Sequence, residues 1–192
     1  LVLKAHIVKE IGYKDAVGMD ILMILHQLKI PTVFPDSVLE EANRVSETIS
    51  PEELEGRVDL RQELTVTIDG ADAKDLDDAV ALVKREDGTF VLTVSIADVS
   101  YYVTENSEMD KEAFERGTSV YLTDRVVPML PQRLSNGICS LHPYEERLTL
   151  TARMEIDRSG TIYQHEIFPS VIQSNERLTY DEVNVLFNTN EA

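Results

Sequence analysis

Residues 79–99, "AVALVKREDGTFVLTVSIADV", form two arms rich in Val, Leu and Thr on either side of the dipeptide Asp87-Gly88. An Asp-Gly pair favours the tight turn of a β-hairpin, because glycine adopts positive φ angles at little cost. The preceding stretch "LTVTID", residues 64–69, has the period of two that is typical of a strand. This region therefore predicts three strands, two of them joined as an antiparallel hairpin.

A second hairpin is predicted further along the chain. "RLTLTARMEI", residues 147–156, and "TIYQHEIFPSVI", residues 161–172, have strand-like composition and are joined by "DRSG". Prolines and a glycine interrupt residues 118–143, so we expect short extended pieces and turns there. Residues 1–14 predict one further strand, which fits the end of a preceding small β domain.

Helical segments are expected beside these strands. Ser50 and Glu53 form a capping box with a proline between them, which marks a helix start, and Thr179 is a candidate cap near the end of the chain. Hairpin-paired strands with adjacent helices indicate an α+β fold with a mixed, largely antiparallel sheet. The expected helical segments are residues 18–30, 36–45, 50–53, 110–116 and 177–187.

Composition and charge limit the classes of function. The chain has 192 residues and is 43% hydrophobic, so it can build a core. It has neither a bilayer-length apolar run nor a secretory signal pattern, so we expect no membrane partner. A single cysteine, Cys139, offers no internal disulfide and fits a reducing, cytoplasmic setting. The net charge of −17 argues against binding phosphate backbones through the overall field, so any nucleic-acid ligand would need cations from elsewhere.

The loop between the predicted strands is strongly acidic. Residues 67–80, "TIDGADAKDLDDAV", contain five aspartates against one lysine, and one of the aspartates ends the strand pattern. A loop that folds back toward this strand end could bring at least three carboxylates to one point. Because carboxylates about 4 Å apart repel by roughly 4 kcal/mol at an effective dielectric of 20, such a cluster requires a cation. The candidate ligands are Asp69, Asp75, Asp77 and Asp78.

Ligands that are all oxygen select hard cations, which are Mg²⁺, Mn²⁺ or Ca²⁺. An EF-hand is excluded, because Val80 occupies the required glycine position counted from Asp75, and Lys74 occupies the third position counted from Asp72. Magnesium is therefore the leading hypothesis. The residues alone leave a solvated acidic turn as an equal alternative.

Several longer motifs carry a resemblance. "DLR", "TVTIDGADAKDLDDAV", "SIADVSYYV", "ERGTSVYL", "VVPMLPQRLSNGICSL" and "RLTLTARMEID" occur in the order found in the RNB family of exoribonucleases. The chain resembles this family from about residue 57 to its end. The resemblance implies that residues 1–14 end an OB-fold-like domain, residues 15–56 are linker helices, and residues 57–192 are the N-terminal part of an RNB catalytic domain.

The resemblance also implies a function. RNB enzymes are processive exoribonucleases that hydrolyse RNA from its 3′ end to nucleoside monophosphates with Mg²⁺, for which Mn²⁺ may substitute. The family motif assigns metal binding to the four aspartates, and places Asp77 beside the second cation and the attacking water as the catalytic residue. It assigns Tyr121 to stacking on a base near the 3′ end of single-stranded RNA.

The RNB family also carries an arginine and a second aromatic ring in a later part of the domain. The chain alone is therefore expected to be inactive and to need the remaining domains of its parent to grip RNA. Two alternatives remain open, a non-catalytic RNA-binding fragment and an acidic interaction module. Asp98 is expected to end its strand rather than to brace the acidic loop, and Tyr101 and Tyr102 are expected to alternate along a strand.

Overall fold

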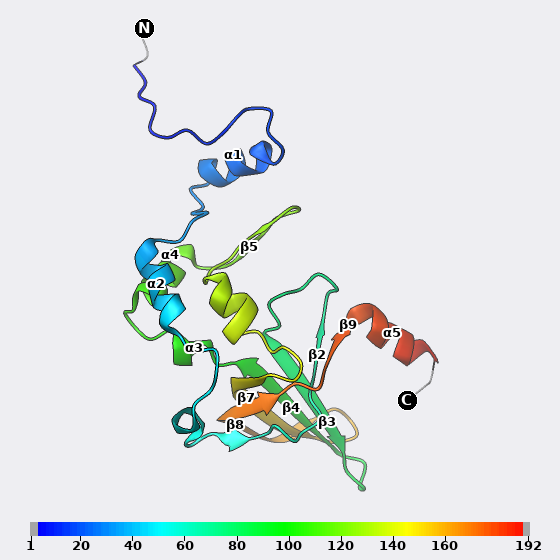
Figure 1. Ribbon diagram of the computed structural model, residues 1–192. Helices are drawn as coiled ribbons and strands as arrows, with labels where there is room; N and C mark the ends of the chain where they lie inside the picture. The colour runs from blue at the N-terminus through cyan, green and yellow to red at the C-terminus, as the bar shows by residue number, and fades with distance from the viewer. Residues whose placement is uncertain (1–3, 190–192) are drawn as a thin grey trace.

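The computed structural model describes residues 4–189 and contains a seven-stranded sheet in the order β1-β8-β7-β4-β3-β2-β9 (Figure 1). The outer pairs β1–β8 and β2–β9 are parallel and the inner pairs are antiparallel, which confirms the α+β class and the largely antiparallel sheet. Strands β5 and β6 form a separate small ladder. The strands are β1 Val58–Asp59, β2 Val66–Asp69, β3 Asp78–Lys84, β4 Phe90–Ala97, β5 Val120–Tyr121, β6 Val126–Val127, β7 Glu146–Ile156, β8 Ile162–Gln173 and β9 Glu176–Thr179.

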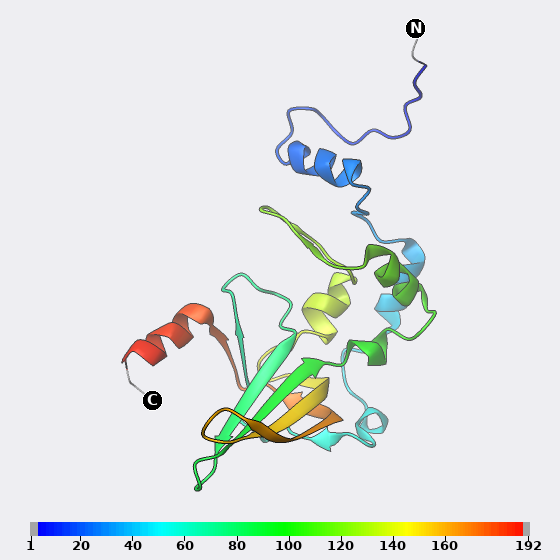
Figure 2. The same cartoon turned by 180° about the vertical axis from the view of Figure 1, so that it is seen from behind.

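Helices lie beside the sheet and at both ends of the described chain. Figures 1 and 2 show α1 and the segment before it extending away from the sheet, and α5 lying at the other end of the chain. No helix within residues 4–189 is long and apolar enough to cross a bilayer. The helical elements are α1 Met19–Gln27, α2 Asp36–Arg44, the 3₁₀ turn η1 Pro51–Leu54, α3 Val99–Tyr102, α4 Glu108–Arg116, the π-helical turn η2 Leu134–Ile138 and α5 Tyr180–Thr189.

Both predicted hairpins are present, and turn chemistry explains them. In the β3–β4 turn Gly88 has φ 82°, and the Asp87 carboxylate accepts a hydrogen bond from the Thr89 amide at 2.9 Å. In the β7–β8 turn Asp157 accepts from the Ser159 amide in the same way, at 2.8 Å. These local contacts fix the register of the four central strands.

Three predictions of secondary structure are wrong. Residues 4–14, the described part of the expected N-terminal strand, form no strand, because no other segment of the described chain pairs with them. Tyr101 and Tyr102 lie in α3 instead of a strand, since β4 ends at Ala97 and the chain turns directly after Asp98. The expected helix 177–187 begins as strand β9, which pairs with β2, and becomes helical only at Tyr180.

Other boundaries agree with the expectations or extend them. The capping box at Ser50 is present, with the Ser50 amide donating to the Glu53 carboxylate at 2.6 Å. Thr179 caps α5, because the Glu182 amide donates to its hydroxyl at 3.3 Å. Within residues 118–143 the extended pieces β5 and β6 occur as expected, whereas the π-helical turn η2 was not predicted.

The main core lies between the sheet and the helical elements that cover one face of it. Its buried side chains come from α2, α4, η2, the sheet and the loops between them. Leu76 belongs to this core and is fully buried, although it lies in the middle of the acidic loop. Burying a leucine contributes roughly 1.5–3 kcal/mol, so this side chain anchors the loop to the fold. The core members are Val38, Ala42, Leu60, Leu76, Ala79, Ala97, Met109, Leu134, Cys139, Leu141 and Ile172.

Candidate active site

The four motif aspartates lie where β2 ends and β3 begins. Asp69 is the last residue of β2, and Asp78 is the first residue of β3. The Ala97 amide donates to the Asp77 carbonyl at 3.0 Å, so the extended pairing between β3 and β4 reaches one residue beyond the strand. Asp69 and Asp75 are half-buried, whereas Asp77 and Asp78 are exposed. The loop therefore presents its carboxylates where strand β2 ends and strand β3 begins, on the same side of the sheet.

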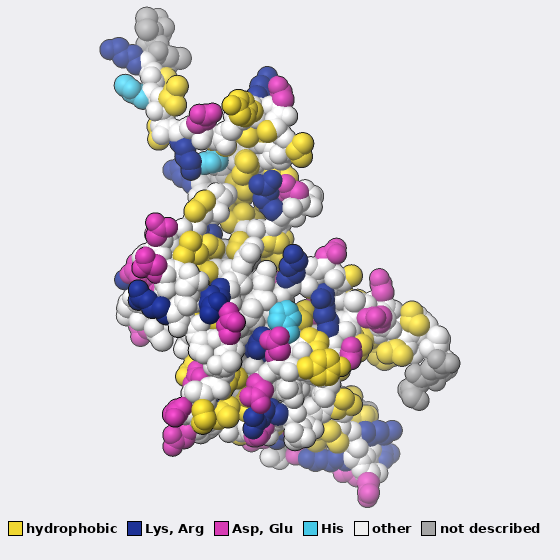
Figure 3. All heavy atoms as spheres, viewed as in Figure 1, with side chains coloured by type: hydrophobic (Ala, Val, Ile, Leu, Met, Phe, Trp, Pro, Cys, Tyr) yellow, Lys and Arg dark blue, Asp and Glu magenta, His cyan; other side chains and the backbone are white. Residues whose placement is uncertain are grey.

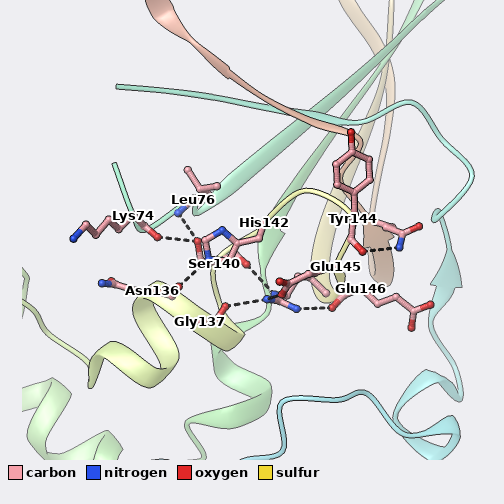
Figure 4. A network of polar contacts seen from close by, with 11 residues as sticks. Lys74, Leu76, Asn136, Gly137, Ser140, His142, Tyr144, Glu145 and Glu146 are labelled. Atoms are coloured by element: carbon pink, nitrogen blue, oxygen red, sulfur yellow. Dashed lines mark hydrogen bonds and ion pairs between the residues drawn. The ribbon is translucent and has the colours of Figure 1, made fainter. Parts of the chain in front are cut away.

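A buried network holds the second half of this loop (Figure 4). The Ser140 hydroxyl accepts from the Leu76 amide and donates to the Lys74 carbonyl, both at 3.0 Å. The Leu141 amide donates to the Leu76 carbonyl at 2.9 Å. Arg147, which is only 8% exposed, fixes the partner segment by donating from Nε to the Ser140 carbonyl at 2.8 Å. Backbone and side-chain contacts thus position the residues on both sides of Asp75.

We expect Ser140→Ala to lower the free energy of unfolding by about 1–3 kcal/mol, because the buried Leu76 amide loses its hydrogen-bond acceptor. Urea denaturation measures this change. Ser159→Ala, in the exposed β7–β8 turn, is the matched control and should change stability by less than about 0.5 kcal/mol. Equal effects of the two substitutions would contradict the role given to Ser140.

Arg177 holds the first half of the loop. This residue of β9 lies beside Thr67 of β2, and its Nη2 atom donates to the carbonyls of Gly70, Ala71 and Ala73 at 3.1, 3.0 and 2.8 Å. Sequence reasoning missed Arg177, Ser140 and Arg147. Each acts through backbone groups that are distant in sequence, so no motif spacing signals it.

Desolvation and repulsion raise the pKa of two of the four aspartates, Asp77 and Asp69. Although the Asp77 side chain is exposed, desolvation by the atoms around it, followed by the charges of Asp75, Asp78 and Asp69, raises its pKa above the usual value of 3.8. Burial and the charge of Asp78 likewise raise the pKa of Asp69, and the Arg177 charge opposes this shift. The four carboxylates therefore share one electrostatic field.

One carboxylate oxygen is left without a partner. Asp69 Oδ2 is buried and makes no hydrogen bond among the described residues. A buried carboxylate oxygen without a donor costs free energy unless a cation or a donor contacts it. Both this oxygen and the all-carboxylate chemistry of the motif fit a hard cation such as Mg²⁺.

The prediction that at least three of these carboxylates lie around one point is wrong for the described residues. Within residues 4–189 no group of three or more His, Cys, Asp or Glu side chains is placed to hold a metal ion. Asp77 and Asp78 are consecutive residues of extended chain and so face opposite sides of the sheet. The Asp75 carboxylate accepts a hydrogen bond from the Tyr121 hydroxyl. Repulsion keeps bare carboxylates apart unless a cation lies between them. Their assignment as metal ligands stays a prediction.

Tyr121 of β5 lies next to this loop. Its hydroxyl donates a hydrogen bond to Asp75 Oδ2, and this bond, together with burial, raises the pKa of Tyr121 to about 12. The side chain is 63% exposed and lines a cleft of about 610 Å³ with Lys74, Arg125 and Asn136. The ring is therefore accessible to a ligand in that cleft, directly beside the acidic loop.

The remaining predicted features have structural explanations. Asp98 directly follows β4, as expected, and forms an ion pair of 2.7 Å with Arg57 in which both side chains are largely buried. Cys139 is buried, and burial raises the pKa of its thiol to about 12. On the face shown in Figure 3, Lys and Arg side chains are interspersed with Asp and Glu and do not gather into one basic band.

Comparisons with known proteins identify the family to which the chain belongs. The family model described as the RNB domain matches residues 57–192. Ribonuclease R 1 of Lactococcus lactis is 56% identical over 95% of this chain and 22% of its own length. Ribonuclease R of Thermotoga maritima is 49% identical over 94% of this chain and 26% of its own length.

A solved structure extends the match to three dimensions. Mycoplasma genitalium RNase R in complex with double-stranded RNA has a TM-score of 0.88 and 37% identity, over 95% of this chain and 32% of that one. The chain thus spans about a quarter of the length of the curated relatives it matches. Within RNB exoribonucleases its motifs resemble bacterial ribonuclease R most closely, and the relatives bear this out. The chain belongs to the RNB family.

Proposed function

We propose that this chain is the metal-binding part of a cytoplasmic exoribonuclease that hydrolyses RNA processively from its 3′ end to nucleoside monophosphates. The observation that carries the proposal is the acidic loop itself. The charges of the four aspartates in the RNB motif act on one another, and one of their oxygens, Asp69 Oδ2, is buried without a partner among residues 4–189. Membership of the RNB family supports the same activity for the longer protein.

Each site residue receives a role in this proposal. Asp69, Asp75 and Asp78 would hold a Mg²⁺ ion, for which Mn²⁺ can substitute, and the ion would neutralise charge on the scissile phosphate. Asp77 is the catalytic carboxylate, which accepts a hydrogen bond from the attacking water and orients it. Tyr121 stacks on a base near the 3′ end, an interaction that every base allows. The RNA phosphates would be gripped by other parts of the longer protein, because this chain carries a net charge of −17.

The test uses a full-length RNB enzyme that carries this segment and an RNA labelled at either end. A label at the 3′ end should appear at once as a mononucleotide, while a 5′ label should remain on progressively shorter RNA. EDTA should stop hydrolysis as measured with either label, and added Mg²⁺ or Mn²⁺ should restore it. Unchanged hydrolysis in EDTA would contradict the cation, and internal cleavage products would contradict the exonuclease.

Substitutions at Tyr121 should separate its ring from its hydroxyl. Tyr121→Ala should weaken binding of single-stranded RNA by about 1–3 kcal/mol and change the length of the final product, because a stacking surface is lost. Tyr121→Phe should preserve both properties, since it removes only the bond to Asp75. Gel analysis of end products measures the effect, with the exposed Tyr144→Ala as control. Identical products from the Ala variant and the unsubstituted enzyme would contradict stacking.

A second candidate function rests on the separation of the carboxylates. Because no three described acidic side chains are placed to hold a metal, a non-catalytic RNA-binding or acidic interaction module is the alternative. An RNA-binding module would retain RNA without shortening it in Mg²⁺. An acidic module would neither bind RNA nor prefer Mg²⁺ to other divalent cations.

A further inference from the structure

Arg177 makes an unusual set of contacts for a strand residue. One guanidinium nitrogen donates to three backbone carbonyls, all between Asp69 and Asp75 (3.1, 3.0 and 2.8 Å). Three carbonyl dipoles that point at one place repel one another, and a positive charge at that place compensates for this. Arg177 therefore stabilises a loop shape that the loop would not keep by itself.

The location of Arg177 connects this loop shape to the acidic motif. Strand β9 lies beside β2 (Figure 1). The two strands pair in parallel, with Arg177 opposite Thr67 and Thr179 opposite Asp69. The Arg177 register position, Thr67, lies two residues before the end of β2 at Asp69. The arginine forms no ion pair with a carboxylate among the described residues, so its direct contacts with the acidic loop are with backbone carbonyls, and its charge acts on Asp69 only from a distance.

The two halves of the loop are held by different side chains. Ser140 fixes Lys74 and Leu76, and Arg177 fixes the carbonyls of residues 70, 71 and 73. Asp75 lies between Lys74 and Leu76, both of which Ser140 holds, and Asp69 lies just before the carbonyls that Arg177 holds. The segment that connects the two half-buried aspartates is therefore the one that Arg177 holds.

We propose that Arg177 is a positioning residue for the cation site, which it serves by fixing the path of the chain from Asp69 to Asp75. This role rests on the proposed function. Residues that orient metal ligands without touching the metal typically change metal affinity by about 10–100-fold when they are substituted. Lysine is an incomplete replacement, because its side chain is shorter than that of arginine and its ammonium group would lie farther from the three carbonyls that Nη2 contacts.

The experiment is a Mn²⁺ titration of the 192-residue chain followed by electron paramagnetic resonance, which needs no catalytic activity. Arg177→Met should weaken Mn²⁺ binding by about tenfold or more. The matched control is Arg85→Met, since Arg85 follows the far end of β3 and pairs with Glu155 at 2.7 Å. Asp69→Asn removes one of the proposed ligands, so the part of the Mn²⁺ binding that this variant loses belongs to the acidic loop. In a full-length RNB enzyme, the same Arg177 variant should raise the Mg²⁺ requirement while the KM for RNA at saturating Mg²⁺ stays unchanged.

The outcomes separate this inference from the proposed function. Mn²⁺ binding by the unsubstituted chain together with near-identical affinity in Arg177→Met would overturn the role of Arg177 and leave the cation site intact. No Mn²⁺ binding at the loop in the unsubstituted chain would overturn both. If the Met variant does not fold, by circular dichroism, Arg177→Lys decides instead. A lower Mn²⁺ affinity of the Lys variant supports the role, and an unchanged affinity refutes it.

Discussion

Asp77→Asn in a full-length RNB enzyme carrying this segment is expected to reduce RNA hydrolysis by a factor on the order of 10³ or more. The substitution keeps the size of the side chain and removes one negative charge from a field shared by four carboxylates. The Asp77 side chain is exposed, and the substitution leaves the bond from the Ala97 amide to the Asp77 carbonyl in place, so the fold should be preserved. Binding of single-stranded RNA should change less than about twofold, because the groups that grip the strand are elsewhere.

Single-turnover hydrolysis and filter binding measure the two quantities separately. Asp72→Asn is the matched control, since Asp72 lies exposed in the same loop and is not one of the four motif aspartates. It should leave hydrolysis within about twofold of the unsubstituted enzyme, as surface substitutions away from a site usually do. Equal losses of binding and turnover in Asp77→Asn, or equal losses in both variants, would contradict the catalytic role of Asp77.

The isolated 192-residue chain is expected to release no mononucleotides from single-stranded RNA at a useful rate. Its net charge of −17 provides few of the Lys and Arg contacts that release counterions from RNA. Among residues 4–189, no three acidic side chains are placed to hold a metal ion together. A cation site without groups that position the phosphate is not a preorganised phosphoryl-transfer site.

A labelled oligoribonucleotide with Mg²⁺ or Mn²⁺ tests this expectation. The isolated chain and its Asp77→Asn variant should give the same background. The full-length enzyme, assayed at the same concentration, shows that the RNA and the buffer support hydrolysis. Mononucleotide release by the isolated chain but not by its Asp77→Asn variant would mean that the acidic loop and Tyr121 suffice for activity.

Short-range patterns predicted most of the fold. The two hairpins followed from Asp87-Gly88 and from "DRSG", because their turns are closed by contacts between residues two apart. The errors occurred where distant partners decide the conformation. Residues 177–179 precede a helix in sequence and yet belong to β9, because their backbone pairs with strand β2.

The candidate site was predictable only in part. The aspartate spacing and the family motifs identified the loop and Tyr121, but they did not predict that the tyrosine hydroxyl would bond Asp75. Nor did they identify Arg177 and Ser140, whose partners are backbone groups of the loop. Spacing also could not decide whether the carboxylates converge, since that depends on repulsion between charges in three dimensions.

The most direct test of the central claim is an anomalous difference map from crystals of this chain soaked in Mn²⁺. A cation site of an RNB exoribonuclease predicts a peak at the acidic loop, about 2 Å from oxygens of Asp69, Asp75 and Asp78. Binding should draw these side chains together from the separate positions described above. An ordered loop with no peak beside it, or with peaks only at other surface carboxylates, would contradict the claim.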